Sequence, residues 1–254
     1  MNLPILYEDA DIVAVNKPAG LITHSDGRTK EETAEDWFKE KYPEAVLPSS
    51  GPTGYVHRLD RDTSGVLVFA KHAATHEFLR KAFHDRGVKK TYLAFVYGIP
   101  KQKKGIINFD IGRSRRDFRL RSAQPKAKGR LRSAVTRFEV VGESGGFALL
   151  LVNPETGRTH QIRVHLKAIH HPIVGDRLYA PGLSKGGAIG NKPQSRGTPN
   201  RPPAGGINRL GLHAYALDLP LPSGAHIRIE APLPSDLAPA LNRFPEAIKK
   251  FAPS

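Results

Sequence analysis

One aspartate stands where its residue type and its neighbours could do chemistry. Asp60 follows Leu59 and precedes Arg61, with Arg58 two residues earlier and the apolar run 66–70 shortly after. Adjacent arginines favour the ionised form of a partly buried carboxylate. An ionised, desolvated carboxylate can act as a nucleophile or as a general base. The same spacing also fits a structural salt bridge at the entrance of a strand, and both interpretations stay open at this point.

A second acid, Asp62, lies two residues beyond Asp60 and is expected to cap a turn through the backbone of Ser64. If Asp62 instead worked together with Asp60, the pair would suit a base glycosylase, because glycosidases usually use two carboxylates. Asp62 has no evident partner for that role, which leaves Asp60 as the candidate catalytic residue.

Metal and cofactor sites are not expected. The chain has no cysteine, which excludes disulfides, thiolate ligands and cysteine nucleophiles. His160, His165 and His170 are spaced by five residues, and such steps rotate by about 140° along a helix and place the side chains on different faces. The glycine-rich signatures of nucleotide binding are absent from the sequence as well.

The charge predicts a nucleic acid or another polyanion as the partner. The 254 residues include 39 Lys and Arg against 24 Asp and Glu, a formal net charge of +15. Residues 113–137 alone carry ten cations and one acid, Asp117, a net of +9. A solvated surface normally mixes both signs to limit self-repulsion. The segment is therefore interpreted as a basic hairpin that follows the phosphates of a nucleic acid.

Periodicity and turn residues place the other elements. Helices are expected at 32–41, 72–86 and 159–169, the last with Thr159 as its N-cap. Short strands are expected at 5–7, 12–15, 66–70, 92–97, 106–111, 118–121, 134–141 and 147–152. Hairpins with scattered helices indicate an α+β fold with a mixed, mostly antiparallel central sheet and flanking helices.

The chain is interpreted as one catalytic domain, residues 1–254. The segment 181–206 holds seven glycines, five prolines and four cations without any acid, and is expected to be a flexible basic insertion. No run is apolar enough to span a membrane, and the first residues lack the features of a secretion signal. These features predict a cytoplasmic protein with no membrane association.

The run His57–Gly65 resembles the signature of the RluA-type family of RNA pseudouridine synthases. Further stretches agree in the expected order, at 8–20, 90–94, 153–166 and 212–214, so the resemblance covers about residues 5 to 230. It implies a mixed, mostly antiparallel sheet crossed by an RNA-binding cleft, and the conversion of uridine in RNA to pseudouridine without a cofactor. Many relatives carry a small RNA-binding domain before the catalytic one, whereas a stand-alone catalytic domain is expected here.

The resemblance also implies roles for single residues. Asp60 is the essential carboxylate, and Arg163 pairs with it. A uridine inside folded RNA must be flipped out of its stack, so Arg58 fills the vacated space or holds the backbone. Tyr92 stacks on the flipped uracil, and Ile162 covers its other face.

Some assignments stay open in the sequence. Val164 could replace Ile162 against the base, and Lys17 could support the site or only belong to a turn. A catalytically inactive RNA-binding protein is an alternative, although it would be free to lose the catalytic residues that this chain retains. Ribosomal and transfer RNA are both candidate substrates. No protein partner is implied, so a monomer is expected.

Overall fold

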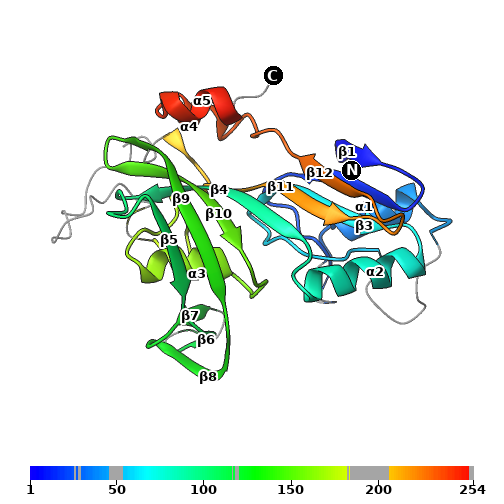
Figure 1. Ribbon diagram of the computed structural model, residues 1–254, viewed down its shortest axis with the longest axis horizontal. Helices are drawn as coiled ribbons and strands as arrows, with labels where there is room; N and C mark the ends of the chain where they lie inside the picture. Colours follow the sequence, from blue (N-terminus) through cyan, green and yellow to red (C-terminus); the bar gives the residue numbers. More distant parts are fainter. Residues whose placement is uncertain are drawn as a thin grey trace. The chain divides into compact units, whose positions relative to one another are not determined.

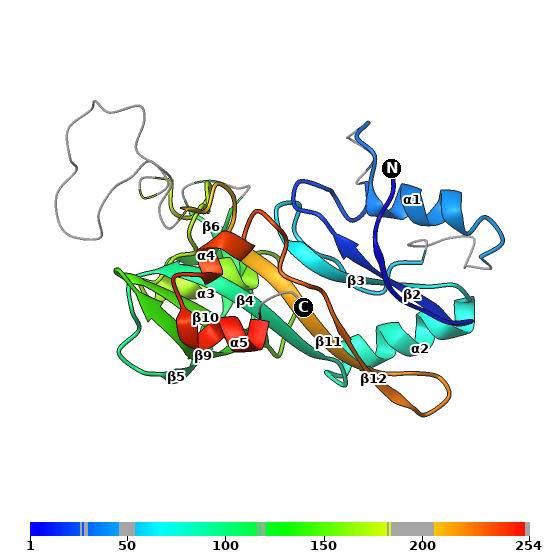
Figure 2. The ribbon, with the colours of Figure 1, turned by 90° about the horizontal axis from the view of Figure 1, so that it is seen from above.

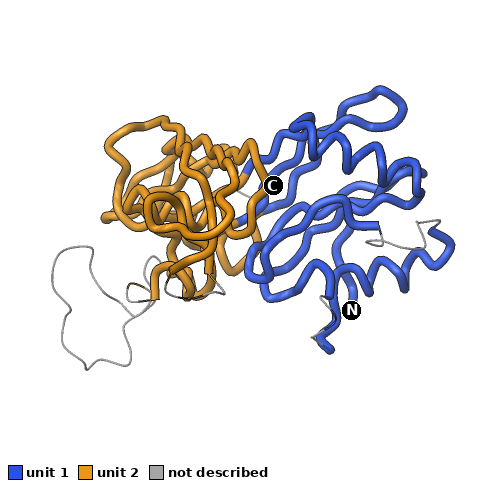
Figure 3. Tube along the Cα trace, turned by 90° about the horizontal axis from the view of Figure 1, so that it is seen from below, with its two compact units in different colours: residues 1–91, 213–232 blue, residues 92–212, 233–254 orange. Residues whose placement is uncertain are grey.

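The computed structural model describes residues 1–25, 27, 30–45, 54–115, 117, 120–181, 183 and 206–251. The expected basic insertion 181–206 lies almost entirely outside these residues. Figure 1 shows the order of the elements along the chain, and Figure 3 shows its two compact units. Unit 1 comprises Met1–Thr91 and His213–Pro232, and unit 2 comprises Tyr92–Leu212 and Leu233–Ser254.

Unit 1 contains strands in the order β1-β2-β3-β11-β12. Their bounds are β1 (Ile5–Glu8), β2 (Ile12–Lys17), β3 (Ser64–Ala70), β11 (Leu212–Pro220) and β12 (His226–Glu230). Neighbouring strands are antiparallel, except that β11 runs parallel to β3 through the pairs His213–Ser64 and Ala214–Gly65. Every residue of β3 is buried, as the continuous apolar run predicts.

Two helices cover the two faces of β3 (Figure 2). Helix α1 (Ala34–Lys41) begins after a capping box between Thr33 and Asp36, and its Phe38 stacks on Phe69. Helix α2 (Ala73–His84) buries Leu79 in a cluster with alternate β3 residues such as Val68. The period of two along the strand therefore supplies a separate core for each helix.

Unit 2 contains four antiparallel strands in the order β4-β10-β9-β5. They are β4 (Lys89–Tyr97, whose first residues lie in unit 1), β10 (Phe147–Pro154), β9 (Val135–Ser144) and β5 (Lys104–Asn108). Helix α3 (Gln161–Ala168) packs on this sheet through Ile162 and Leu166. The unit also contains α4 (Ala238–Leu241) and α5 (Pro245–Phe251).

The basic segment forms a second sheet in unit 2, where a single hairpin is expected. Its strands are β6 (Ile111–Ser114), β7 (Arg121–Ala123) and β8 (Ala127–Arg132), with β6 in the middle and antiparallel to both neighbours. Ile111 and Ala123 are buried with Val164 and Tyr179, and this apolar contact anchors the small sheet to α3.

The predicted α+β fold with a mostly antiparallel sheet is confirmed, whereas the expected RNA-binding cleft stays a prediction. Only the β3–β11 pair is parallel among the strand pairs described above. No helix in the described part of the chain is long and apolar enough to cross a membrane.

Candidate active site

Asp60 lies in unit 1, on the segment that leads into β3. Asp60 itself is half-buried, and Leu59 before it is buried. The neighbouring charged residues Arg58, Arg61 and Asp62 are exposed. The chain turns directly after Asp60, because the backbone N–H of residue 63 donates to the Asp60 carbonyl over 3.1 Å. The Arg61 guanidinium donates to Glu31 (2.7 Å) and to the Gly20 carbonyl (3.1 Å), and the turn presents Asp60 as a half-buried acid.

A buried lysine, Lys17, stabilises this turn through hydrogen bonds to backbone carbonyls. The Lys17 side chain is fully buried, and its ammonium donates to the carbonyls of Pro18 (2.8 Å), Leu21 (2.7 Å) and Arg61 (3.1 Å). The third of these carbonyls directly follows Asp60 in the chain. Lys17 therefore supports the candidate site, one of the two roles that the sequence left open.

The backbone on both sides of Asp60 is also fixed by hydrogen bonds to the turn after β2. Thr23 Oγ1 donates to the Leu59 carbonyl (3.0 Å) and lies 3.2 Å from the Leu59 N–H, which donates to it. The Gly20 N–H donates to the Arg61 carbonyl over 2.9 Å. These bonds leave the catalytic candidate little backbone freedom.

A buried serine and histidine join the end of the turn to β11. Ser64 Oγ lies 2.9 Å from His213 Nδ1, and His213 Nε2 lies 3.1 Å from the Ala231 carbonyl. A carbonyl can only accept, so Nε2 donates to it, and in the neutral imidazole Nδ1 then accepts from the Ser64 hydroxyl. The strands approach so closely here that a Cβ on Gly65 (φ +117°) would stand 2.1 Å from the Ala214 oxygen.

The first residue of the run, His57, has a structural role. Its Nε2 accepts the backbone N–H of Val68 over 3.0 Å, and its ring stacks on Phe83 with the ring centres 4.8 Å apart. Burial, with a smaller contribution from the charge of Lys90, lowers the pKa of His57 to about 3. The imidazole is therefore neutral and braces the strand that follows Asp60.

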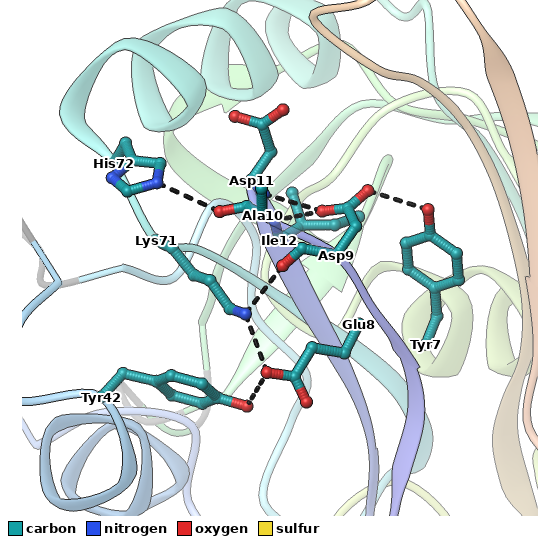
Figure 4. Close-up of polar contacts among 9 residues, drawn as sticks. All are labelled: Tyr7, Glu8, Asp9, Ala10, Asp11, Ile12, Tyr42, Lys71 and His72. Carbon is teal, nitrogen blue, oxygen red and sulfur yellow. Dashed lines mark hydrogen bonds and ion pairs between the residues drawn. The ribbon is translucent and has the colours of Figure 1, made fainter.

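The opening motif of the chain forms a second structural cluster (Figure 4). Glu8 accepts from the Tyr42 hydroxyl and the Lys71 ammonium, both over 2.8 Å, and these bonds lower the pKa of Glu8. Asp9 Oδ1 accepts two backbone N–H groups, including that of Ile12, over 2.8 Å. These contacts hold the β1–β2 turn in place.

Unit 2 brings together the candidates for base recognition. Tyr92 is half-buried on β4, opposite Val152 of β10. Its ring packs against the hydrophobic cluster that contains Ile162, a side chain with only 6% of its surface exposed. Tyr92 therefore packs on the buried cluster that contains Ile162, while Val164 belongs to the neighbouring cluster under the small sheet.

Arg163 has a buried partner that the sequence did not indicate. Its Nε and Nη2 donate to the two carboxylate oxygens of Asp176 over 2.8 and 2.9 Å, and both side chains are buried. Asp176 Oδ1 also accepts the backbone N–H groups of Leu178 and Tyr179. Asp176 lies 13 residues from Arg163, with no local signal to connect the two. The expected pairing of Arg163 with Asp60 stays a prediction.

The start of α3 corrects one expectation. His160, not Thr159, is the N-cap; it adopts a left-handed conformation (φ 57°) and makes no side-chain cap bond. A tertiary contact accounts for this cap, because His160 Nδ1 forms a hydrogen bond with the hydroxyl of the distant Tyr179 over 2.8 Å. The Tyr179 ring in turn lies 5.1 Å from the Arg163 guanidinium and 5.4 Å from the Lys167 ammonium.

The small sheet presents a basic surface. The exposed cations are Arg113, Arg115, Lys126, Lys128, Arg130 and Arg132, and none of them has an ion-pair partner in the described part of the chain. Arg137 on β9 differs, since it pairs with Glu155 over 2.5 Å.

Comparison with known proteins identifies the class of this fold and site. The structure resembles two human proteins, RNA pseudouridylate synthase domain containing 4 (TM-score 0.70, 25% identity, 94% of this chain and 92% of that chain) and domain containing 1 (0.68, 26%, 92% and 84%). The fold is therefore that of a pseudouridylate synthase domain.

Sequence relatives lead to the same family. Residues 11–168 match the model described as RNA pseudouridylate synthase. An uncharacterized RNA pseudouridine synthase of Bacillus subtilis is 35% identical over 239 residues, covering 93% of this chain and 70% of that protein. Ribosomal large subunit pseudouridine synthase D of Xylella fastidiosa is 37% identical over 242 residues, covering 94% and 68%.

The chain belongs to the RNA pseudouridine synthase family and is an isomerase. This confirms the predicted family and enzyme class, and the comparisons favour neither the glycosylase nor the inactive alternative.

Proposed function

We propose that Asp60 is the catalytic carboxylate of this enzyme and that structured RNA, with ribosomal RNA first, is its substrate. The observation that carries the assignment is the half-buried acid on a turn whose backbone is bonded on both sides. The relative from Xylella fastidiosa, whose name refers to the large ribosomal subunit, supports the choice of RNA.

The reaction needs little besides a positioned carboxylate. The N1–C1′ bond of the uridine breaks, the uracil turns while still bound, and C5 joins C1′. The C5 hydrogen is lost and N1 gains a proton, so the nucleotide keeps its composition. No electron sink or energy input is required. An ionised Asp60 can serve as a nucleophile or as a base in this scheme, and rigid placement matters in either case.

We assign recognition of the flipped base to groups of unit 2. A flipped uracil has two faces that must be covered once it leaves the stack. Tyr92 supplies an aromatic face backed by the cluster that contains Ile162. Arg163, oriented by its fork to Asp176, supplies a fixed guanidinium, and the exposed Arg58 contacts the RNA from the Asp60 segment.

The basic sheet β6–β8 supplies general affinity for the RNA backbone, because its exposed cations can release counterions from phosphates. The cysteine-free composition and an RNA substrate support action in the cytoplasm, and we propose that the enzyme works there as a monomer.

The assignment is tested with Asp60→Asn and with Asp62→Asn as a matched control. Tritium release from RNA labelled at uridine C5 measures turnover, and salt-dependent binding is measured in parallel. Asp60→Asn is expected to abolish release while keeping RNA affinity, whereas Asp62→Asn keeps both. Residual turnover of Asp60→Asn within tenfold of the unaltered enzyme would remove Asp60 from the catalytic role.

A further inference from the structure

Three cations stand in one row across the small basic sheet. Arg113 of β6 pairs directly with Arg121 of β7 on one side and with Lys128 of β8 on the other. Directly paired residues of antiparallel strands project to the same face, with Cβ atoms about 5 Å apart. None of the three side chains has a carboxylate partner among the described residues. We name Arg121, Arg113 and Lys128 the cation row.

This arrangement opposes the stability of the sheet. Like charges placed directly opposite each other destabilise a strand pair. Cations on the adjoining sheet of the same unit are instead neutralised. Lys104 of β5 pairs with Glu139 over 3.2 Å, and Arg137 of β9 pairs with Glu155. Among the described residues, the cations of β5 and β9 thus have a counter-charge, whereas the three of the cation row have none.

The cation row lies on strands that contact α3, the helix that bears Arg163, and Tyr179. Arg113 is two residues from Ile111 and hence on the same face of β6. On that face Ile111 is buried against Val164 of α3 and against Tyr179. The backbone N–H of Arg121, a member of the row, donates to the Tyr179 hydroxyl over 3.0 Å. An anion held by the row would be coupled through this contact to the start of α3.

We propose that the cation row is a phosphate site for the substrate RNA, and that the bound phosphodiester supplies the counter-charge that the sheet lacks. The inference deepens the proposed function and rests on RNA being the substrate. Its distinctive consequence is a trade-off. Removing one charge from the row stabilises the free sheet but weakens RNA binding, whereas an ordinary surface cation affects binding alone.

The test compares Arg113→Gln with Lys126→Gln, an exposed cation between β7 and β8 that is outside the row. Both changes are made in the full chain carrying Asp60→Asn, so that turnover plays no part. Hydrogen–deuterium exchange of the β6–β8 amides is followed with and without polyuridylic acid, and affinity is measured against salt concentration. Lys128→Gln repeats the row variant on the edge strand β8.

Each row variant is expected to slow exchange of the free sheet by about two- to fivefold, the effect of removing one like-charge opposition. The variants should also lose most of the protection that RNA adds. Lys126→Gln should leave exchange of the free sheet unchanged and weaken affinity only, with the salt slope reduced by about one in all variants.

Two results would overturn the proposal. If the row variants and Lys126→Gln show the same exchange in the free protein, the row is ordinary charged surface. If the row variants speed exchange, the cations stabilise the sheet and no anion is needed. Failure of Asp60 in the turnover assay would leave these measurements intact, so the two proposals fail separately.

Discussion

Lys17→Met should weaken both the fold and the catalytic turn. The substitution keeps the length of the side chain but removes the donor from three backbone carbonyls. The Arg61 carbonyl keeps the Gly20 N–H as a donor, whereas Pro18 and Leu21 have no other carbonyl partner in the described residues. All three bonds to the ammonium are therefore lost, and two of the acceptors keep no other protein donor among the described residues.

The magnitude follows from that count. Each lost hydrogen bond costs about 0.5 to 1.5 kcal/mol when its acceptor can turn to water, so loss of the three bonds should lower the free energy of unfolding by about 1.5 to 4.5 kcal/mol. The lower half of this range is expected, because loss of the buried ammonium also removes its desolvation cost. Release of the Arg61 carbonyl also frees the turn after Asp60, and a displacement of about 1 Å can lower the rate by about 100-fold.

Urea unfolding measures the first effect, and single-turnover pseudouridine formation at saturating RNA measures the second. Lys39→Met is the matched control, since Lys39 lies on the surface of α1 with half of its side chain exposed and a single ion pair to Glu35. The control should stay within about 0.5 kcal/mol of the unaltered protein. If Lys17→Met stays within about 1 kcal/mol and threefold in rate, the lysine does not hold the turn.

Two further predictions concern buried polar groups. Because the pKa of His57 is lowered to about 3, the unfolded chain binds a proton below about pH 6.5 that the folded chain does not. Stability therefore falls as the pH is lowered from about 6.5 toward 3, by up to about 1.4 kcal/mol per pH unit. His57→Gln should flatten that slope in pH-dependent unfolding and the exposed His226→Gln should not; equal slopes would contradict the neutral buried imidazole. Arg163→Lys loses the fork to Asp176 while keeping the charge, and should cost about 1.5 to 3 kcal/mol in urea unfolding and also slow turnover. Unchanged stability would show that the fork contributes nothing.

Several elements could be predicted because their causes are local. The apolar run 66–70 has no polar residue to expose and becomes the fully buried β3. The helix expected at 32–41 forms as α1, two residues shorter at its start, because Thr33 and Asp36 complete a capping box. The signature around Asp60 predicted the family, which the comparisons confirm.

Other features depend on residues that are distant in the sequence. The hairpin expected at 113–137 gains a third strand because β6 pairs on both edges and buries Ile111 under α3. The cap of α3 moves from Thr159 to His160 because Tyr179 binds the imidazole. Neither the propensity nor the charge of a local segment contains this information.

The sequence by itself determined the charge, the candidate acid at Asp60 and the family. Only the tertiary structure decided which groups hold that acid and its proposed helpers, since Lys17 reaches across 44 residues to the Arg61 carbonyl and Arg163 finds its partner in Asp176. The physical reason is desolvation. A buried charge must find partners wherever the fold places them, and the folded chain, not the spacing of its residues, sets those positions.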